Sequence, residues 1–211
     1  MHIQFDSRMH PLKSNKIIQE TKKYSKQMSI KDLHHGFEHS QRVRNYALHL
    51  AKNQKADKQI IEIASYLHDI GRGHEKEEYH TQTSVKLAKT FLTNQNLPKE
   101  KIHKIIHCIE THSRKKLHRK TPQTIEAKIL YDADGLEMIG AVGLLRTALS
   151  AQVQNKDWNH VLKKAKWRLQ IKDDFLTKTA KRIAKQRQNL LKTFIQQFTL
   201  ELQTQIEEVT K

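Results

Sequence analysis

The pair His68-Asp69 is the most specific chemical feature of the sequence, and Gly71 follows it closely. Neighbouring residues rarely share one face of a helix, but at a fraying C-terminal turn both side chains can bend toward one ion. Imidazole nitrogen and carboxylate oxygen suit Mn, Fe, Zn, Co or Mg. One such pair is weak evidence alone, so the prediction of a metal site depends on the residues that accompany it.

Three further polar residues stand in apolar surroundings. His39 lies 29 residues before the pair, on the same helical stripe as a run of apolar side chains. Asp132 and Asp134 flank Ala133 inside the hydrophobic stretch ILYDADGLEMIGAVGLL. A buried carboxylate is costly unless it is paired or bound to a metal. A lone His39 would more often be a core histidine bonded to a carbonyl, but together these residues favour ligands delivered from three helices.

The elements that must position these residues are helices nearly throughout. Apolar residues recur at i, i+3, i+4 and i+7, and no stretch shows sustained period-2 alternation. The expected helices cover residues 13–27, 38–53, 57–70, 79–94, 99–111, a segment from about 123, and 174–209. The predicted fold class is therefore all-α.

Proline and glycine mark the expected helix ends. Thr121 is expected to cap a helix that has Pro122 in its first position. Gly71 is expected to end the helix before it as a C-cap. Gly140 and Gly143 allow close packing or a bend.

Residues 144–211 contain neither glycine nor proline. Near their end, apolar residues follow a near-heptad spacing: Leu191, Phe194, Ile195, Phe198, Leu202, Ile206 and Val209. Such a stripe packs either on the body of the protein or on a second chain. A homodimer through this C-terminal helix is thus one expectation.

The net charge of +17 calls for an anionic partner. Residues 151–192 hold 12 Lys and Arg against 3 Asp and Glu, a net +9. Phosphorylated small molecules, nucleic acid and anionic membranes all fit this charge, and so does a surface tuned for solubility.

Composition indicates a soluble, cytoplasmic protein. The hydrophobic content is 36% and the mean hydropathy is -0.77. No apolar run approaches the roughly 20 residues of a membrane span, and the N-terminus has no apolar core of a secretory signal. The single Cys108 cannot form an internal disulfide, which fits a reducing compartment.

The segments around these residues resemble the H…HD…D signature of the HD-domain phosphohydrolase superfamily. HGFEHSQRVRNYALHLA contains His39, ASYLHDIGR contains the pair, and ILYDADGLEMIGAVGLLR contains Asp134. The likeness covers about residues 33–150 and is strongest to small bacterial HD hydrolases of nucleotides and related phosphates. It implies an HD-domain helical bundle and hydrolysis of a phosphoester or phosphoanhydride by a metal-activated water.

The resemblance also assigns roles. It matches His39, His68, Asp69 and Asp134 to the ligands of a divalent metal, with His68 and Asp69 at the catalytic centre. Asp132 then supports the ligands or faces the substrate.

A second metal ion is suggested by two more histidines. His80 and His112 are similar to the extra ligands of binuclear HD proteins, in which Asp69 would bridge both ions. His74, His103 and His107 lie nearby in the sequence and compete for the same role. One or two metal ions per chain are therefore expected, with manganese or iron among the candidates.

Arginines are the expected contacts of the substrate phosphate. Arg42 follows His39 by one turn, Arg72 follows the pair, and Arg146 follows the last segment. Each could equally be a surface ion pair. Many relatives carry a basic residue where this chain has Gly135, so a phosphate contact is expected to be missing there.

The basic loop that follows His112 is a further candidate. It contains Arg114, Lys115, Lys116, Arg119 and Lys120 and could collect polyanionic substrates, or simply be solvated.

The sequence therefore predicts an HD domain over residues 1–150, with its core at about 33–150. A basic C-terminal helical extension over 151–211 packs on the domain or continues it. The predicted activity is metal-dependent hydrolysis of a small phosphorylated substrate, with a nucleotide as the expected substrate. The alternative is a catalytically weak HD fold that binds nucleic acid or a phosphoryl ligand through its basic surface.

Overall fold

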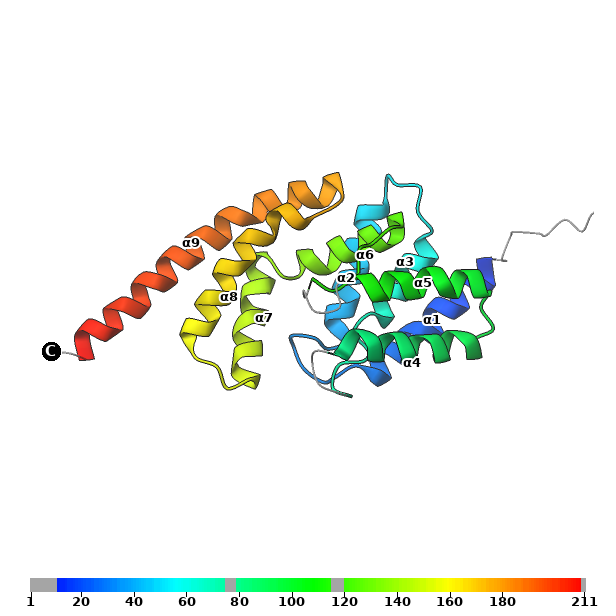
Figure 1. The fold of residues 1–211 in the computed structure, drawn as a ribbon, viewed down its shortest axis with the longest axis horizontal. Helices are drawn as coiled ribbons and strands as arrows, with labels where there is room; N and C mark the ends of the chain where they lie inside the picture. The colour runs from blue at the N-terminus through cyan, green and yellow to red at the C-terminus, as the bar shows by residue number, and fades with distance from the viewer. Residues whose placement is uncertain (1–10, 75–78, 115–119, 210–211) are drawn as a thin grey trace, which may run out of the picture.

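The structure is a computed structural model that describes residues 11–74, 79–114 and 120–209 (Figure 1). These residues form helices and no β-strand, which confirms the all-α prediction. In chain order the helices are α1 (Pro11–Met28), α2 (Phe37–Ala51), α3 (Lys58–Leu67), α4 (His80–Asn94), α5 (Lys99–Thr111), α6 (Ile125–Leu136), α7 (Gly140–Val153), α8 (Trp158–Gln170), the short 3-10 helix η2 (Ile171–Asp174) and α9 (Lys178–Val209).

The larger hydrophobic core lies among α1 to α6, with α3 at its centre. α3 packs against α1, α2, α5 and α6, and Ile61, Ile63 and Leu67 are fully buried. All residues of α3 except Lys58 and Glu62 are buried, so other parts of the protein cover most sides of this helix. On the outside of this bundle the rings of Tyr24 and Phe91 stack at 4.3 Å and join α1 to α4.

Two predicted helix ends differ from the structure. α6 begins at Ile125 with Thr124 as its cap, whose hydroxyl accepts a hydrogen bond from the Ala127 amide at 3.2 Å, so the prediction of Thr121 and Pro122 was wrong. Thr124 is an equally good capping residue, and it is followed by the apolar periodic residues.

Gly71 is not the C-cap of α3, which ends four residues earlier at Leu67. Its amide donates to Ser84 Oγ at 2.9 Å, and a β-carbon there would overlap the backbone at His80 and Ser84. Gly71 therefore permits the turn after α3 to approach the start of α4.

The bend expected near Gly140 and Gly143 is present. α6 and α7 meet at 72°. Gly140 has a φ of 81°, which favours glycine, and a β-carbon on Gly143 would overlap the carbonyl of Met138. This bend directs the chain out of the larger core.

The break between α7 and α8 had no glycine or proline to predict it. Asn155 adopts a φ of 51°, a conformation that asparagine tolerates better than most residues. Asp157 then caps α8 by accepting from the His160 amide at 2.9 Å. Because asparagine and aspartate make this break, the sequence did not predict α8 as a separate helix.

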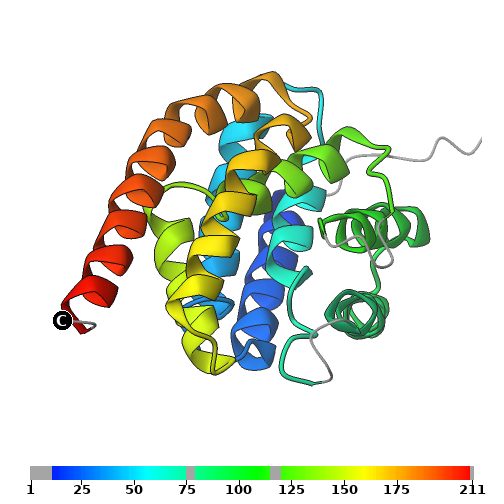
Figure 2. The same cartoon turned by 60° about the vertical axis from the view of Figure 1, so that its left-hand side comes forward.

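The C-terminal helix packs on its own chain. Leu191 and Ile195 of α9 join Leu144 of α7 and Ala165 of α8 in a second, smaller core. Figures 1 and 2 show α9 running along α7 and α8 and continuing toward the C-terminus. The boundary predicted at residue 150 falls inside α7, and a homodimer through α9 stays a prediction.

Within the described residues, no single helix is long and apolar enough to span a bilayer, although α6 and α7 pass the length and composition test together as a bent pair.

Candidate metal centre

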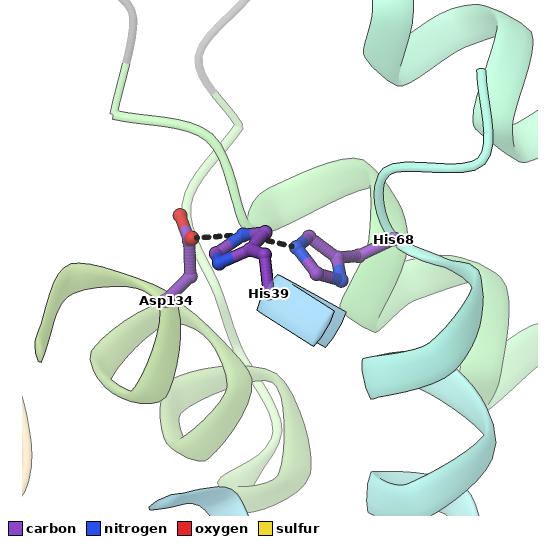
Figure 3. A group of neighbouring side chains, drawn as sticks. All are labelled: His39, His68 and Asp134. Atoms are coloured by element: carbon purple, nitrogen blue, oxygen red, sulfur yellow. Dashed lines mark hydrogen bonds and ion pairs between the residues drawn. The ribbon is translucent and has the colours of Figure 1, made fainter. Parts of the chain in front are cut away.

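Three predicted ligands from separate helices meet at one point (Figure 3). His39 lies in the first turn of α2, His68 is the cap residue after α3, and Asp134 lies in the last turn of α6. His39 Nε2 is 3.3 Å from both His68 Nε2 and Asp134 Oδ1. The ligand atoms of this trio lie within 4.8 Å of one another, a spacing that suits a shared metal ion.

Asp69 connects this trio to a second group. Its Oδ2 lies 3.7 Å from His39 Nε2 and 3.6 Å from His68 Nε2. Its Oδ1 faces His80 Nε2 at 3.6 Å and His112 Nε2 at 3.4 Å. One carboxylate therefore has one oxygen toward each group, which is the arrangement of a bridging ligand.

The histidine rings are oriented by bonds on their far side. His68 Nδ1 donates to the Ser65 carbonyl at 2.8 Å, and His112 Nδ1 donates to the Ile109 carbonyl at 2.7 Å. A carbonyl can only accept, so Nδ1 carries a proton, and Nε2 presents a lone pair whenever the ring is neutral. This is how proteins orient histidines that bind metals.

Glu137 orients His39 in the same way, and it was missing from the predicted site. Its Oε2 lies 3.3 Å from His39 Nδ1 and accepts from Arg42 Nε at 2.8 Å. Glu137 stands three residues after Asp134, so the i, i+3 spacing could have placed it on the same side of α6. Arg42, predicted to contact phosphate, instead supports this carboxylate and is not among the described residues that line the cavity.

The charge states suit metal binding. Burial lowers the pKa of His68 to about 4, so the ring is neutral at pH 7. Burial would raise the pKa of Asp69, but Arg72 and His68 hold it well below its ordinary value. Burial would likewise raise the pKa of Asp134, and His39 outweighs that effect. Neutral imidazoles and ionised carboxylates are the forms that bind metal. His112 is the exception: burial lowers its pKa, but the hydrogen bond and charge of Asp69 outweigh burial and raise it, so this ring would give up a proton when a metal binds.

A buried atom without a partner tests whether a cation fits. Asp69 Oδ1 accepts no hydrogen bond from the described residues, although it is buried and its carboxylate is ionised. Such an atom is costly unless something positive meets it. A divalent ion between this oxygen and the neighbouring Nε2 atoms would do so, and the donor set is one that binds Mn, Fe, Co or Zn.

The competing histidines lie apart from the cluster. His74 and His103 are exposed, and His107 Nε2 accepts from the Gln123 amide at 3.1 Å. Of the five histidines proposed for a second ion, the structure brings His80 and His112 to Asp69.

A cavity of about 320 Å³ opens above the cluster. His80, His112 and Asp134 lie on one side of it, and residues of α7 and α8 form the other. The basic side chains that line the cavity come from several segments: Arg72, Arg114, Arg146, Lys164 and Arg168. Asp134 is the one carboxylate among the described lining residues, so the cavity is suited to an anion.

Two of the three predicted arginines line this cavity. Arg72 is buried and donates to Asp69 Oδ2 at 2.6 Å. Arg146 donates to the carbonyls of His34 at 2.6 Å and Glu137 at 3.0 Å. Both side chains therefore also hold parts of the site in place.

Asp132 has a structural role that differs from the expected one. Its carboxylate accepts from the Leu176 amide at 2.9 Å and the Thr177 amide at 2.6 Å, just before α9. Asp132 thus fastens α9 to α6, and it is not among the described residues that line the cavity.

The basic C-terminal extension contributes residues that the sequence did not single out. His160, Lys164, Trp167 and Arg168 of α8 line the cavity opposite the cluster. No motif marks them, because their approach depends on the α6–α7 bend and the break before α8. In the basic loop, Lys115, Lys116 and Arg119 lie outside the described residues.

Comparisons with known proteins identify the family of the chain. A family model for the HD domain matches residues 36–139. The YpgQ protein of Bacillus subtilis is 30% identical over 178 residues, covering 77% of this chain and 82% of that protein.

Solved structures extend the likeness along the chain. The Lin1889 protein of Listeria innocua has a TM-score of 0.71 at 29% identity and covers 90% of this chain and 97% of its own. Bacillus subtilis YpgQ in complex with ADP has a TM-score of 0.71 at 24% identity, covering 87% and 97%. An HD-superfamily hydrolase of Bacillus thuringiensis has a TM-score of 0.67 at 25% identity, covering 90% and 98%. Coverage this high includes helices after residue 150.

Proposed function

The chain belongs to the HD-domain superfamily, and on that premise we propose that it is a metal-dependent phosphohydrolase acting on a nucleotide. The bond cleaved would be a phosphoester or a phosphoanhydride. The observation that carries the proposal is the histidine and aspartate cluster at one side of a cavity whose other charged groups are nearly all cations.

We assign the first ion to His39, His68, Asp69 and Asp134. A second ion would be held by His80, His112 and the other oxygen of Asp69, and the distances of 3.4 and 3.6 Å support it. A divalent ion in this position supplies Lewis-acid activation of a water and of the phosphoryl group.

The side chains around the cluster have separate tasks in this proposal. Arg72 and Arg146 neutralise phosphate charge. Arg72 also holds Asp69 in position through its hydrogen bond, and Arg146 holds the end of α6 through the Glu137 carbonyl. Glu137 keeps the lone pair of His39 Nε2 directed at the cluster. The α8 side chains line the side of the cavity opposite the cluster.

Two observations support a nucleotide as the substrate. The relative YpgQ has been crystallised in complex with ADP. In this chain, Trp167 is partly exposed and lines the cavity beside Lys164, so an aromatic face and a cation stand together. Aromatic faces stack with nucleobases, and cations pair with phosphates.

The proposal is tested by phosphate release from a panel of nucleoside mono-, di- and triphosphates with Mn, Fe, Co or Mg. The panel compares the wild-type protein with His68→Ala and Asp134→Ala. The exposed His103 supplies a matched control, His103→Ala, in which a histidine is lost outside the cluster.

We expect metal-dependent release that both cluster variants abolish and His103→Ala retains. Equal release by His68→Ala and the wild-type protein would contradict the metal centre. A folded protein that binds nucleotides or nucleic acid without hydrolysing any substrate with any ion would favour the binding module instead.

A further inference from the structure

Arg114 stands at the edge of the cavity, two residues after His112. We propose that Arg114 contacts a phosphoryl oxygen of the substrate and that Gly135 lacks a side chain so that the guanidinium can lie there. The proposal rests on the proposed function, because it assigns part of the same site.

The guanidinium of Arg114 is held firmly in place. Its Nη1 donates to the Tyr131 carbonyl at 2.6 Å. Its Cζ lies 3.8 Å from the centre of the Tyr131 ring and 5.2 Å from that of Phe175. Stacking and one hydrogen bond fix the plane of the group, so any ligand meets a preorganised cation.

Gly135 and Arg114 occupy complementary space. A β-carbon on residue 135 would overlap Cζ and Nη2 of Arg114. Because this guanidinium is buried and fixed by Tyr131, it cannot move aside cheaply. A side chain at 135 and Arg114 in this position therefore exclude one another.

The guanidinium of Arg114 has further N–H donors besides Nη1. Its Nε and Nη2 are buried and have no hydrogen-bond partner among the described residues, while the whole residue is 8% exposed. The charges of Asp134, Asp132 and Asp174 stabilise this cation, but these two donors form no hydrogen bond with them. Buried donors without an acceptor are costly, and an anionic ligand would supply one. Asp134, which we assign to the metal, is the neighbour of Gly135, so an anion on Arg114 would lie beside the metal centre.

The chemical class of that anion follows from the donor set. Guanidinium groups pair with phosphate through parallel N–H bonds. Asp134 is the one carboxylate among the described lining residues, and the charges of Asp132 and Asp174 act on Arg114 from outside the lining. Arg114, from another segment, would supply the phosphate contact that was expected to be missing at Gly135.

The competing explanation for the position of Arg114 is that it only stabilises α6, through Tyr131, and does not contact the substrate. Arg187 offers a matched control because it makes the same kinds of contact away from the cavity. Its Nη1 donates to the Leu136 carbonyl at 2.6 Å, and its Cζ lies 5.0 Å from the centre of the Tyr46 ring. Arg187 is not among the described lining residues.

The test is the affinity of manganese-loaded protein for inorganic phosphate, measured by titration calorimetry. The variants are Arg114→Ala, Arg114→Gln, Gly135→Ala, the double variant Arg114→Ala with Gly135→Arg, and Arg187→Ala. Phosphate binding requires no turnover, so the test stands even if the proposed hydrolysis fails. Melting temperatures measured in parallel report any loss of this stabilisation.

We expect each single change at 114 or 135 to weaken phosphate binding about tenfold or more. The double variant should recover most of that loss, since Gly135→Arg returns a cation to the emptied space. Arg187→Ala should lower the melting temperature and leave phosphate affinity unchanged. Phosphate affinity unchanged in both Arg114 variants, or an equal loss in Arg187→Ala, would overturn the proposal.

Discussion

Each histidine of the centre with an assigned Nδ1 partner reaches the cluster through Nε2. His39, His68 and His112 have Nδ1 beside Glu137 and the carbonyls of Ser65 and Ile109, respectively. Protein groups therefore orient the proposed ligands, and single residues behind these ligands should affect metal affinity.

Glu137 provides the clearest case. We predict that Glu137→Gln weakens Mn²⁺ binding about tenfold or more, because the charge that orients and polarises His39 is lost. Metal titration of both proteins checks this. The control is Arg42→Ala, which removes the other partner of the carboxylate and should have a smaller effect. Equal Mn²⁺ affinity in the Glu137→Gln variant and the wild-type protein would contradict the role of Glu137.

The lowered pKa of His68 predicts a pH dependence of the metal-free protein. The pKa is about 4 in the folded state and 6.5 in the ordinary reference state, so the unfolded chain binds the proton first as pH falls. Stability is therefore complete above pH 6.5 and is lost toward pH 4, by on the order of 3 kcal/mol at most.

Denaturant unfolding of chelator-treated protein across this pH range measures the effect. His68→Gln should show a smaller fall in unfolding free energy than the wild-type protein. An identical pH profile in the two proteins would show that the His68 pKa is not the cause.

The proposed ligands could be identified from the sequence, but the residues that hold them in place were harder to predict. His68-Asp69, His39 and Asp134 are polar residues in apolar segments, where burial demands a partner. The i, i+3 spacing from Asp134 could have placed Glu137 on the same side of α6, but its contact with Arg42 depends on the packing of α2 against α6.

At the scale of elements, the centre is assembled from helix ends. Residues near the ends of α2, α3, α4, α5 and α6 meet there, so the position of each helix end matters more than its length. Hydrophobic periodicity predicted that most of these helices exist. It did not predict the break at Asn155, because no glycine or proline marks it.

Asp132 is predicted to stabilise one of these elements. Asp132→Asn weakens two buried hydrogen bonds to backbone amides before α9, which should lower the free energy of unfolding by roughly 1–3 kcal/mol. Denaturant unfolding measures this change. Mn²⁺ affinity should stay the same, and a loss of Mn²⁺ affinity without a loss of stability would restore the expected role of Asp132 beside the ligands.

At the scale of the whole molecule, the extension completes the site. The larger core holds the cluster, while α7 and α8 form the opposite side of the cavity. The positive charge of residues 151–192 is thus partly explained by the cavity that they line, although the sequence alone could not distinguish this from a solvated surface.

Adjacent lysines on α8 test this arrangement. Lys164 lines the cavity, whereas Lys163 does not. We predict that Lys164→Ala raises KM for a hydrolysed nucleotide about threefold or more with little change in kcat, because an attraction for phosphate is lost. Lys163→Ala removes the same charge and should leave KM unchanged. Equal effects of the two substitutions would indicate general charge and not a cavity contact.

Metal content and phosphate release, determined on the same purified sample, test the central claim most directly. The comparison is between wild-type protein, Asp69→Asn and His103→Ala, each offered Mn, Fe, Co, Zn and Mg. We predict bound metal and metal-dependent release of phosphate from a nucleotide in the wild-type protein and His103→Ala, and the loss of both in Asp69→Asn. A folded wild-type protein that holds none of these ions and releases no phosphate would contradict the account.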